Sequence, residues 1–198
     1  MSHAINDDAL DTVFRNARTY RKWTPAAVTP QMLMAAYDLM RWAPTTNNTC
    51  PARIAFVVSQ AAKERLKPHL NKGNVEQTMT APAIAIFAYD LRFYDQMPKL
   101  SPNNPTSRES WMQKTPAEIE EAAFRSGTLQ AAYFMFAARA VGLDCGPMSG
   151  FSNQGVDKEF FAGTSVKSNF LCNLGYGSEE GLRPRAPRLD FDEACTIL

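Results

Sequence analysis

The sequence lacks the signatures of metal-binding and disulfide-rich proteins. It has only two histidines, His3 and His69, and four scattered cysteines at Cys50, Cys145, Cys172 and Cys195. Zinc and iron–sulfur sites need soft ligands clustered at fixed spacing, so we expect no metal site. We also expect no disulfide framework and interpret the cysteines as small buried thiols.

Charge imbalance and long apolar runs are missing as well. The 21 Lys and Arg residues nearly balance 20 Asp and Glu residues, which gives no broad field for nucleic acid or an anionic membrane. The most apolar stretch, Ala131–Ala138, is far shorter than the roughly 20 residues that cross a bilayer. Residues 1–11 carry acids instead of a basic and then an apolar region, so we expect no signal peptide and a cytoplasmic protein.

The usual nucleotide and nucleophile motifs are absent too. The chain has no Gly-x-Gly-x-x-Gly, no Gly-x-x-x-x-Gly-Lys-Ser/Thr, no Gly-x-Ser-x-Gly and no His-Glu-x-x-His. No isolated carboxylate pair stands out, and we assign no catalytic side chain. If the chain is an enzyme, a bound cofactor therefore supplies the reactivity.

What is present predicts an α+β fold. Apolar periodicity and capping residues predict helices and strands that do not alternate regularly, which argues against a doubly wound parallel sheet. With 198 residues and no interior linker, we expect one domain over residues 1–198. The expected helices are 7–18, 30–43, 61–66, 116–141 and 155–161, and the expected strands are 53–58, 83–89, a short one near 144, and 167–174.

Two helices carry clear local signals. The second opens at Thr29-Pro30, and its predicted buried stripe is Leu33, Ala36, Tyr37 and Met40. The longest begins with a capping box from Thr115 to Glu118 and stops at Gly142. Between the two helices, Leu91–Lys114 holds three prolines and little periodicity, which predicts a long loop: a lid, a binding loop or a disordered insertion.

Basic stretches lie at opposite ends of the chain, at residues 18–23 (Arg-Thr-Tyr-Arg-Lys-Trp) and 183–188 (Arg-Pro-Arg-Ala-Pro-Arg). Guanidinium groups beside a hydroxyl suit a phosphate, because they offer forked donors to several oxygens. If folding brings the ends together, they form one phosphate clamp. Two solvated basic segments, or a nucleic-acid patch, are the alternatives.

Two further stretches suit a flat polar ligand. Residues 42–51 place two hydroxyls and two amides within four positions, framed by Pro44 and Pro51, although a capping turn explains one or two of them. Residues 146–151 (Gly-Pro-Met-Ser-Gly-Phe) hold glycines that let a ring approach the backbone, although such turns are common.

Together and in this order, these stretches resemble the nitroreductase family of flavoproteins. The resemblance covers nearly the whole chain and implies a mainly antiparallel sheet flanked by helices, an intertwined homodimer, FMN at the subunit interface, and NADPH or NADH as co-substrate. The cofactor-binding residues that it implies are Arg18, Thr19 and Arg21; Pro44, Thr45, Thr46 and Asn48, which reach the flavin of the other subunit; Asn74; Pro147, Met148, Ser149 and Gly150; and Arg183 and Arg185.

Departures from the family pattern bear on the substrate. Thr19 replaces a serine and keeps the hydroxyl, whereas Cys50, Ala52 and Ser149 replace Gln, Trp and Glu of many relatives. The sequence forms at Cys50–Arg53, Gly146–Phe151 and Pro187–Cys195 resemble one subgroup, the malonic semialdehyde reductases of pyrimidine degradation, which form 3-hydroxypropionate. This resemblance implies hydride transfer from NADH or NADPH through flavin N5 to a small aldehyde, and Arg108 is a candidate for the substrate carboxylate.

Two other functions stay open at this point. A broad nitro or quinone reductase would share the fold and the cofactor and differ only in the pocket. A flavin-binding module without catalysis would retain its ligand without oxidising NADH or NADPH.

Overall fold

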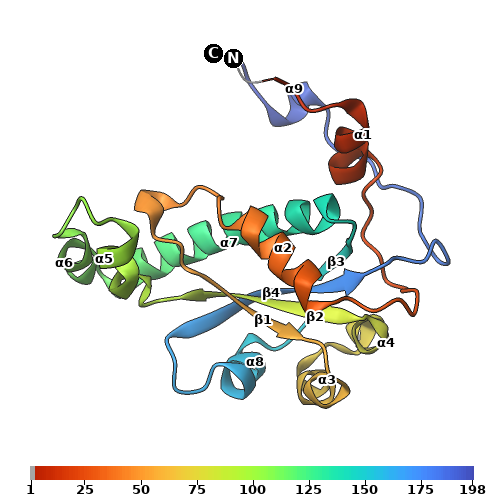
Figure 1. Ribbon diagram of the computed structural model, residues 1–198, viewed down its shortest axis with the longest axis horizontal. Coiled ribbons are helices and arrows are strands. Elements are labelled where there is room, and N and C mark those ends of the chain that lie inside the picture. Colours follow the sequence, from red (N-terminus) through yellow and green to blue (C-terminus); the bar gives the residue numbers. More distant parts are fainter. Residues whose placement is uncertain (1–2) are drawn as a thin grey trace.

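A four-stranded antiparallel sheet with helices on both faces forms the centre of the molecule (Figure 1). The computed structural model describes residues 3–198. Neighbouring strands pair in the order β1-β2-β4-β3, and each pair is antiparallel. The predicted α+β class and antiparallel sheet are confirmed. The strands are β1 (Ala52–Val57), β2 (Ala83–Asp90), β3 (Asp144–Met148) and β4 (Val166–Gly175).

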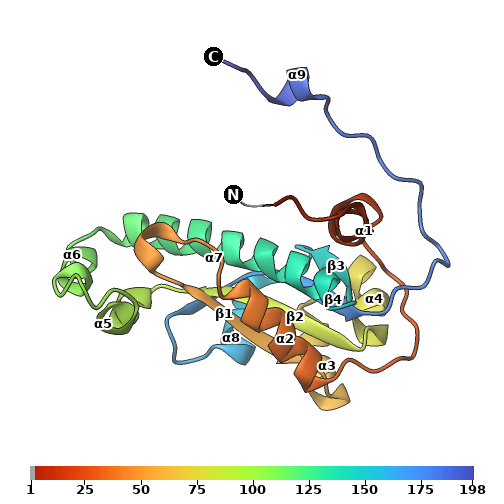
Figure 2. The same ribbon diagram turned by 45° about the horizontal axis from the view of Figure 1, so that its top comes forward.

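Helices cover both faces of this sheet. On one face lie α2 and α7, and on the other lie α3 and α8 (Figures 1 and 2). The α-helices are α1 (Asp7–Leu10), α2 (Pro30–Met40), α3 (Gln60–Leu66), α4 (Val75–Thr80), α5 (Met97–Leu100), α6 (Ser107–Met112), α7 (Pro116–Ala140), α8 (Asn153–Phe160) and α9 (Phe191–Ala194). A π-helical turn, Asp11–Arg15, extends α1, and 3-10 turns lie at Thr46–Asn48, Lys67–His69, Lys72–Asn74 and Phe93–Gln96.

Strand β2 is apolar from Ala83 to Ala88 because both of its faces are buried. Ala83, Ala85 and Phe87 join the core beneath α2 and α7. Ile84 and Ile86 join the second core, beneath α3 and α8. Alternate side chains of a strand point to opposite faces, so a continuous apolar run is what two covered faces require.

Helix α7 lies close to β2 because small residues line its contact face. A Cβ added at Gly127 would be 3.0 Å from the Cβ of Tyr89. The predicted start of α7 is also confirmed: Thr115 and Glu118 form a reciprocal capping box. Gly142 follows the helix with a φ of 86°, a left-handed conformation that favours glycine.

The prediction of a long loop over Leu91–Lys114 is wrong. The segment folds into the 3-10 turn Phe93–Gln96 and helices α5 and α6. Phe93 is fully buried in a small third core against α7, with its ring 4.9 Å from that of Trp111. Short helical pieces carry too little periodicity for a sequence pattern to detect, and tertiary packing stabilises them.

Smaller corrections concern the first helix, Tyr37 and the cysteines. The first helical segment ends at Arg15, so Arg18 lies beyond it. Tyr37 is 47% exposed, because it lies at the edge of the buried row of α2 formed by Leu33, Ala36 and Met40. Cys145 and Cys172 are buried as predicted, but Cys50 is half-buried in a loop and Cys195 is exposed in the tail.

None of the helices within residues 3–198 has the length and apolarity needed to cross a membrane.

The capping box of α7 should contribute measurably to stability. Thr115 accepts from the backbone N–H of Glu118 at 3.3 Å. Replacing a threonine cap by alanine costs about 1 kcal/mol. We therefore expect Thr115→Ala to lower the free energy of unfolding in urea by that amount. Thr80→Ala is the control, since the Thr80 hydroxyl donates only within its own helix.

The same box sets a pH dependence. Backbone and side-chain hydrogen bonds from Thr115 lower the pKa of Glu118 from its ordinary 4.5 to about 2. Because the pKa of Glu118 is lower in the folded state, its carboxylate contributes fully to folding stability above pH 4.5, and this contribution is lost as the pH falls towards 2. The stability difference between wild type and Thr115→Ala should shrink over that interval. A constant difference would contradict this assignment.

Candidate functional site

An extended N-terminal segment lies against the end of the sheet. Thr19 forms a parallel bridge with Cys145, and the N–H of Tyr20 donates to the Cys145 carbonyl at 3.1 Å. This close approach depends on Gly146, where an added Cβ would be 2.5 Å from the backbone carbonyl oxygen of Tyr20. Residues 18–22 are thus fixed beside β3.

The C-terminal basic segment returns to the same place. The guanidinium of Arg18 donates to the Arg183 carbonyl, across 165 residues of sequence. Arg185 Nη2 donates to the carbonyls of Arg15 and Ala17 at 2.7 and 3.0 Å. The structure therefore brings the two basic stretches together, as the phosphate-clamp interpretation requires.

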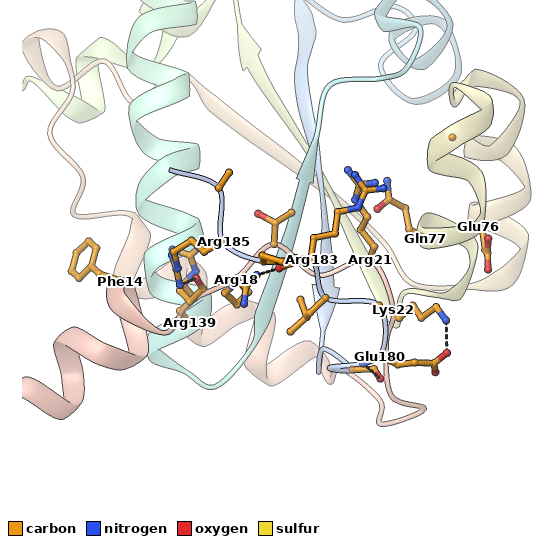
Figure 3. A pocket seen from close by; sticks show the side chains of 18 of the residues that line it. Phe14, Arg18, Arg21, Lys22, Glu76, Gln77, Arg139, Glu180, Arg183 and Arg185 are labelled. Atoms are coloured by element: carbon orange, nitrogen blue, oxygen red, sulfur yellow. Dashed lines mark hydrogen bonds and ion pairs between the residues drawn. The ribbon is translucent and has the colours of Figure 1, made fainter. Parts of the chain in front are cut away.

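Between these segments lies a cavity of about 640 Å³ with a strong excess of positive charge (Figure 3). Its ionisable lining contains two carboxylates, Glu76 and Glu180, and seven cations. Among the residues that the structure describes, only Lys22 and Glu180 of this lining form an ion pair, at 2.5 Å, and Lys22 holds the pKa of Glu180 below its ordinary value. The cations are Arg18, Arg21, Lys22, Arg139, Arg183, Arg185 and Arg188.

Such a lining is suited to a multiply charged anion. Guanidinium groups present planar, forked donors that match phosphate oxygens, and they keep their charge at any physiological pH. The hydroxyl of Thr19 lies in the same lining. Of the predicted cofactor-binding residues, the structure gathers Arg18, Thr19, Arg21, Arg183 and Arg185 around this one cavity.

A row of amides connects the cavity to the turn that follows β3. Gln77 lines the cavity and donates to Asn74 Oδ1 at 2.6 Å. Asn74 Nδ2 in turn donates to the Gly150 carbonyl at 2.9 Å. Because the Gly150 carbonyl can only accept, the Asn74 amide must turn Nδ2 towards it and Oδ1 towards Gln77, which leaves one Nδ2 hydrogen without a partner in this row.

The predicted turn residues form their own shallow hollow. Pro147, Met148 and Ser149 line it together with Asn169 and Phe170. Gly150, the next residue along the chain, packs against Asn74 and Asn71. The row from Gln77 to Gly150 is thus the link between this hollow and the arginine-lined cavity.

The polar loop between α2 and β1 lies elsewhere. Pro44, Thr45, Thr46 and Asn48 are not part of the cavity lining. Asn48 Nδ2 donates to the Leu100 carbonyl at 2.8 Å, which places the loop beside α5. Figure 1 shows it at the α5–α6 end of the molecule, whereas α4 lies near the opposite end. Within one chain, the loop and the arginines do not meet.

Sequence reasoning missed several cavity residues. Gln77 and Arg139 line the cavity without belonging to any of the singled-out stretches. Gln77 lies three positions after Asn74 on the chain, the spacing at which side chains meet on a helix, and this signal could have found it. Arg108 is held in an ion pair with Asp95 at 2.9 Å and lies outside the cavity lining.

Comparison with known proteins gives the family. A model of the nitroreductase family matches residues 14–176. The chain belongs to the nitroreductase family. The match includes Arg18, Thr19 and Arg21, whereas Arg183 and Arg185 lie beyond it.

Relatives agree with this assignment along the whole chain. A protein of Stenotrophomonas maltophilia strain K279a, provisionally named an NADH dehydrogenase/NAD(P)H nitroreductase, is 51% identical over 197 residues and 100% of both chains. A solved nitroreductase of Bacillus subtilis has a TM-score of 0.88 at 19% identity, over 98% of this chain and 100% of that one. A nitroreductase of Exiguobacterium sibiricum, solved in complex with FMN, has a TM-score of 0.87 at 18% identity over both full chains. At these identities the two solved structures establish the nitroreductase fold.

Gly150 should tolerate no side chain. An added Cβ would be 2.5 Å from Asn74 Nδ2, so we expect Gly150→Ala to displace the Asn74 amide and to destabilise the protein by about 1–3 kcal/mol in urea unfolding. Gly73→Ala is a matched control on the neighbouring turn, since a Cβ there meets nothing within 4 Å. Equal stability of the two variants would refute the close packing at Gly150.

Proposed function

We propose that this nitroreductase-family protein is an FMN-dependent oxidoreductase that uses NADH or NADPH. The observation that carries the proposal is the cavity in which basic residues from both chain ends gather almost without carboxylate partners. A dianionic phosphate would neutralise that charge. The proposed cofactor-binding residues are Arg18, Thr19, Arg21, Pro44, Thr45, Thr46, Asn48, Asn74, Pro147, Met148, Ser149, Gly150, Arg183 and Arg185.

The residues present fit this cofactor. The cavity of about 640 Å³ lies within the roughly 300–1,000 Å³ typical of cofactor pockets. Arginines at one part of it suit the phosphate, and the orientated amide of Asn74 suits the polar edge of a flavin ring. The FMN bound by the Exiguobacterium relative and the NAD(P)H names of the curated relatives support the assignment.

The part of the protein is binding and orientation. When bound, FMN would supply two-electron transfer between the nicotinamide and the acceptor. Arg18 and Arg185 would neutralise the phosphate, and Thr19 would donate its hydroxyl to the same group. Backbone N–H groups at Ser149 and Gly150 and the amide of Asn74 would fix the ring. We assign no side chain as a catalytic acid.

We further propose that two copies of the chain form each flavin site. The loop of Thr45 to Asn48 lies at the far end of the molecule from the arginines, so it would reach a shared flavin only from a second copy. Exposed apolar side chains on α2 and α7 support such an assembly. They are Met34, Tyr37, Leu39 and Trp42 on or just after α2, and Phe124, Leu129 and Tyr133 on α7.

For the substrate, we propose malonic semialdehyde, reduced to 3-hydroxypropionate. Support comes from the sequence forms at Cys50–Arg53, Gly146–Phe151 and Pro187–Cys195, which resemble that subgroup. A broad nitro or quinone reductase is the second candidate, and the names of the curated relatives favour it.

Anaerobic absorbance spectroscopy tests cofactor and substrate together. We expect the purified protein to show a flavin band that bleaches with NADPH or NADH and returns when malonic semialdehyde is added. Return only with quinones or nitro compounds would leave the oxidoreductase assignment intact and refute the aldehyde. A protein that binds added FMN but never oxidises the nicotinamide would be a non-catalytic flavin module. A protein that binds no FMN would refute the proposal.

The assembly has its own test. Trp42 is 79% exposed directly after α2, so Trp42→Glu should place a charge in the proposed subunit contact. We expect sedimentation equilibrium to show a dimer for wild type and a dimer weakened at least roughly tenfold for the variant. Val58→Glu, at an exposed apolar residue after β1, is the control and should stay dimeric. A monomeric wild type, or an unaffected variant, would contradict the contact.

A further inference from the structure

Arg139 lies in the cavity although no motif points to it. It lies in the last turn of α7, is half-buried, and lines the cavity together with Arg18 and Arg185. Figure 3 shows Arg139 and Arg185 next to each other, with Arg18 nearby. Arg139 Nη1 donates to the Val13 carbonyl at 3.1 Å. Three guanidinium groups from three separate chain segments thus line one cavity.

These three charges have no carboxylate partner within residues 3–198. The nearby acids Asp7 and Asp11 are both paired with Arg15, at 2.8 and 3.1 Å. By contrast, Arg125, on the same helix as Arg139, forms an ion pair with Glu121. The hydrogen bonds of Arg18, Arg139 and Arg185 all end on backbone carbonyls, which carry no net charge. Gathering like charges in this way costs free energy unless an anion accompanies them.

We propose that Arg139 is a third guanidinium ligand of a phosphate monoester in this cavity. The inference rests on the proposed function, in which the phosphate is that of FMN. A guanidinium has five N–H donors, and the Val13 carbonyl occupies one of them, so the others are available to phosphate oxygens. If Arg139 only held α7 against the N-terminal segment, its removal would weaken the binding of FMN and riboflavin equally.

Riboflavin is the discriminating probe, because it has the ring of FMN but no phosphate. The dissociation constants of FMN and riboflavin would be measured by fluorescence quenching for wild type, Arg139→Ala, Arg139→Lys and Arg125→Ala. We expect Arg139→Ala to raise the dissociation constant of FMN roughly tenfold or more, while that of riboflavin changes less than about twofold. The FMN dissociation constant of Arg139→Lys should lie between those of wild type and Arg139→Ala, since lysine keeps the charge but lacks the forked planar donors of a guanidinium. Arg125→Ala should match wild type.

Equal weakening of FMN and riboflavin by Arg139→Ala would make the residue a structural brace and overturn the proposal. An unchanged FMN affinity would overturn it as well. These outcomes differ from failure of the proposed function, in which wild type itself would bind neither flavin.

Inorganic phosphate gives a second readout that needs no flavin. We expect phosphate to raise the melting temperature of wild-type apoprotein more than chloride at the same ionic strength. In Arg139→Ala this phosphate-specific rise should shrink, and in Arg125→Ala it should persist. A rise of the same size in Arg139→Ala would overturn the proposal even if flavin binding failed altogether.

Discussion

Hydrogen bonds from guanidinium groups to backbone carbonyls are the interaction on which the arginine-lined cavity depends. Arg18 donates to the Arg183 carbonyl, and Arg185 donates to the carbonyls of Arg15 and Ala17. These bonds join the two end segments of the chain beyond the short antiparallel bridge between Trp23 and Gly177. They also leave the positive charge in place, because a carbonyl satisfies a donor without neutralising it. The same contacts therefore build the cavity and leave it positively charged.

The sheet positions this cavity through one feature of its centre, the burial of both faces of β2. Small residues such as Ala83 and Ala85 on one face let α7 pack closely against the strand, and the last turn of α7 carries Arg139. On the other side of the sheet, β3 ends in the turn that holds Gly150 against Asn74. The rigid layers thus bring a helix end, a strand end and the two basic segments to the same region. Side chains from distant parts of the sequence meet there because regular elements hold them.

How far the sequence could be interpreted depended on the range of the forces involved. The capping box at Thr115 and the helix opening at Pro30 were predicted correctly, because both are set by neighbouring residues. The helices within residues 91–114 were missed, because burial of Phe93 beneath α7 holds them. Tyr37 has the right spacing for the core, yet it faces outward, since the width of the buried row is decided by the helices and strands packed against α2. Gln77 and Arg139 lay outside every motif because the packing of distant elements, and not the neighbouring residues, brings them to the cavity.

The sequence by itself determined the fold class and the approximate bounds of the main helices and strands, and it singled out the two basic stretches as candidates for a phosphate site. Periodicity, caps and composition act over a few residues, so they can be recognised without the fold. Only the tertiary structure decided that Arg139 joins Arg18 and Arg185, that the loop of Thr45 to Asn48 lies away from them, and that Arg108 is taken up by Asp95. Those facts depend on which elements pack together in space. Long-range packing is decided by the burial of whole surfaces, which a local pattern does not encode.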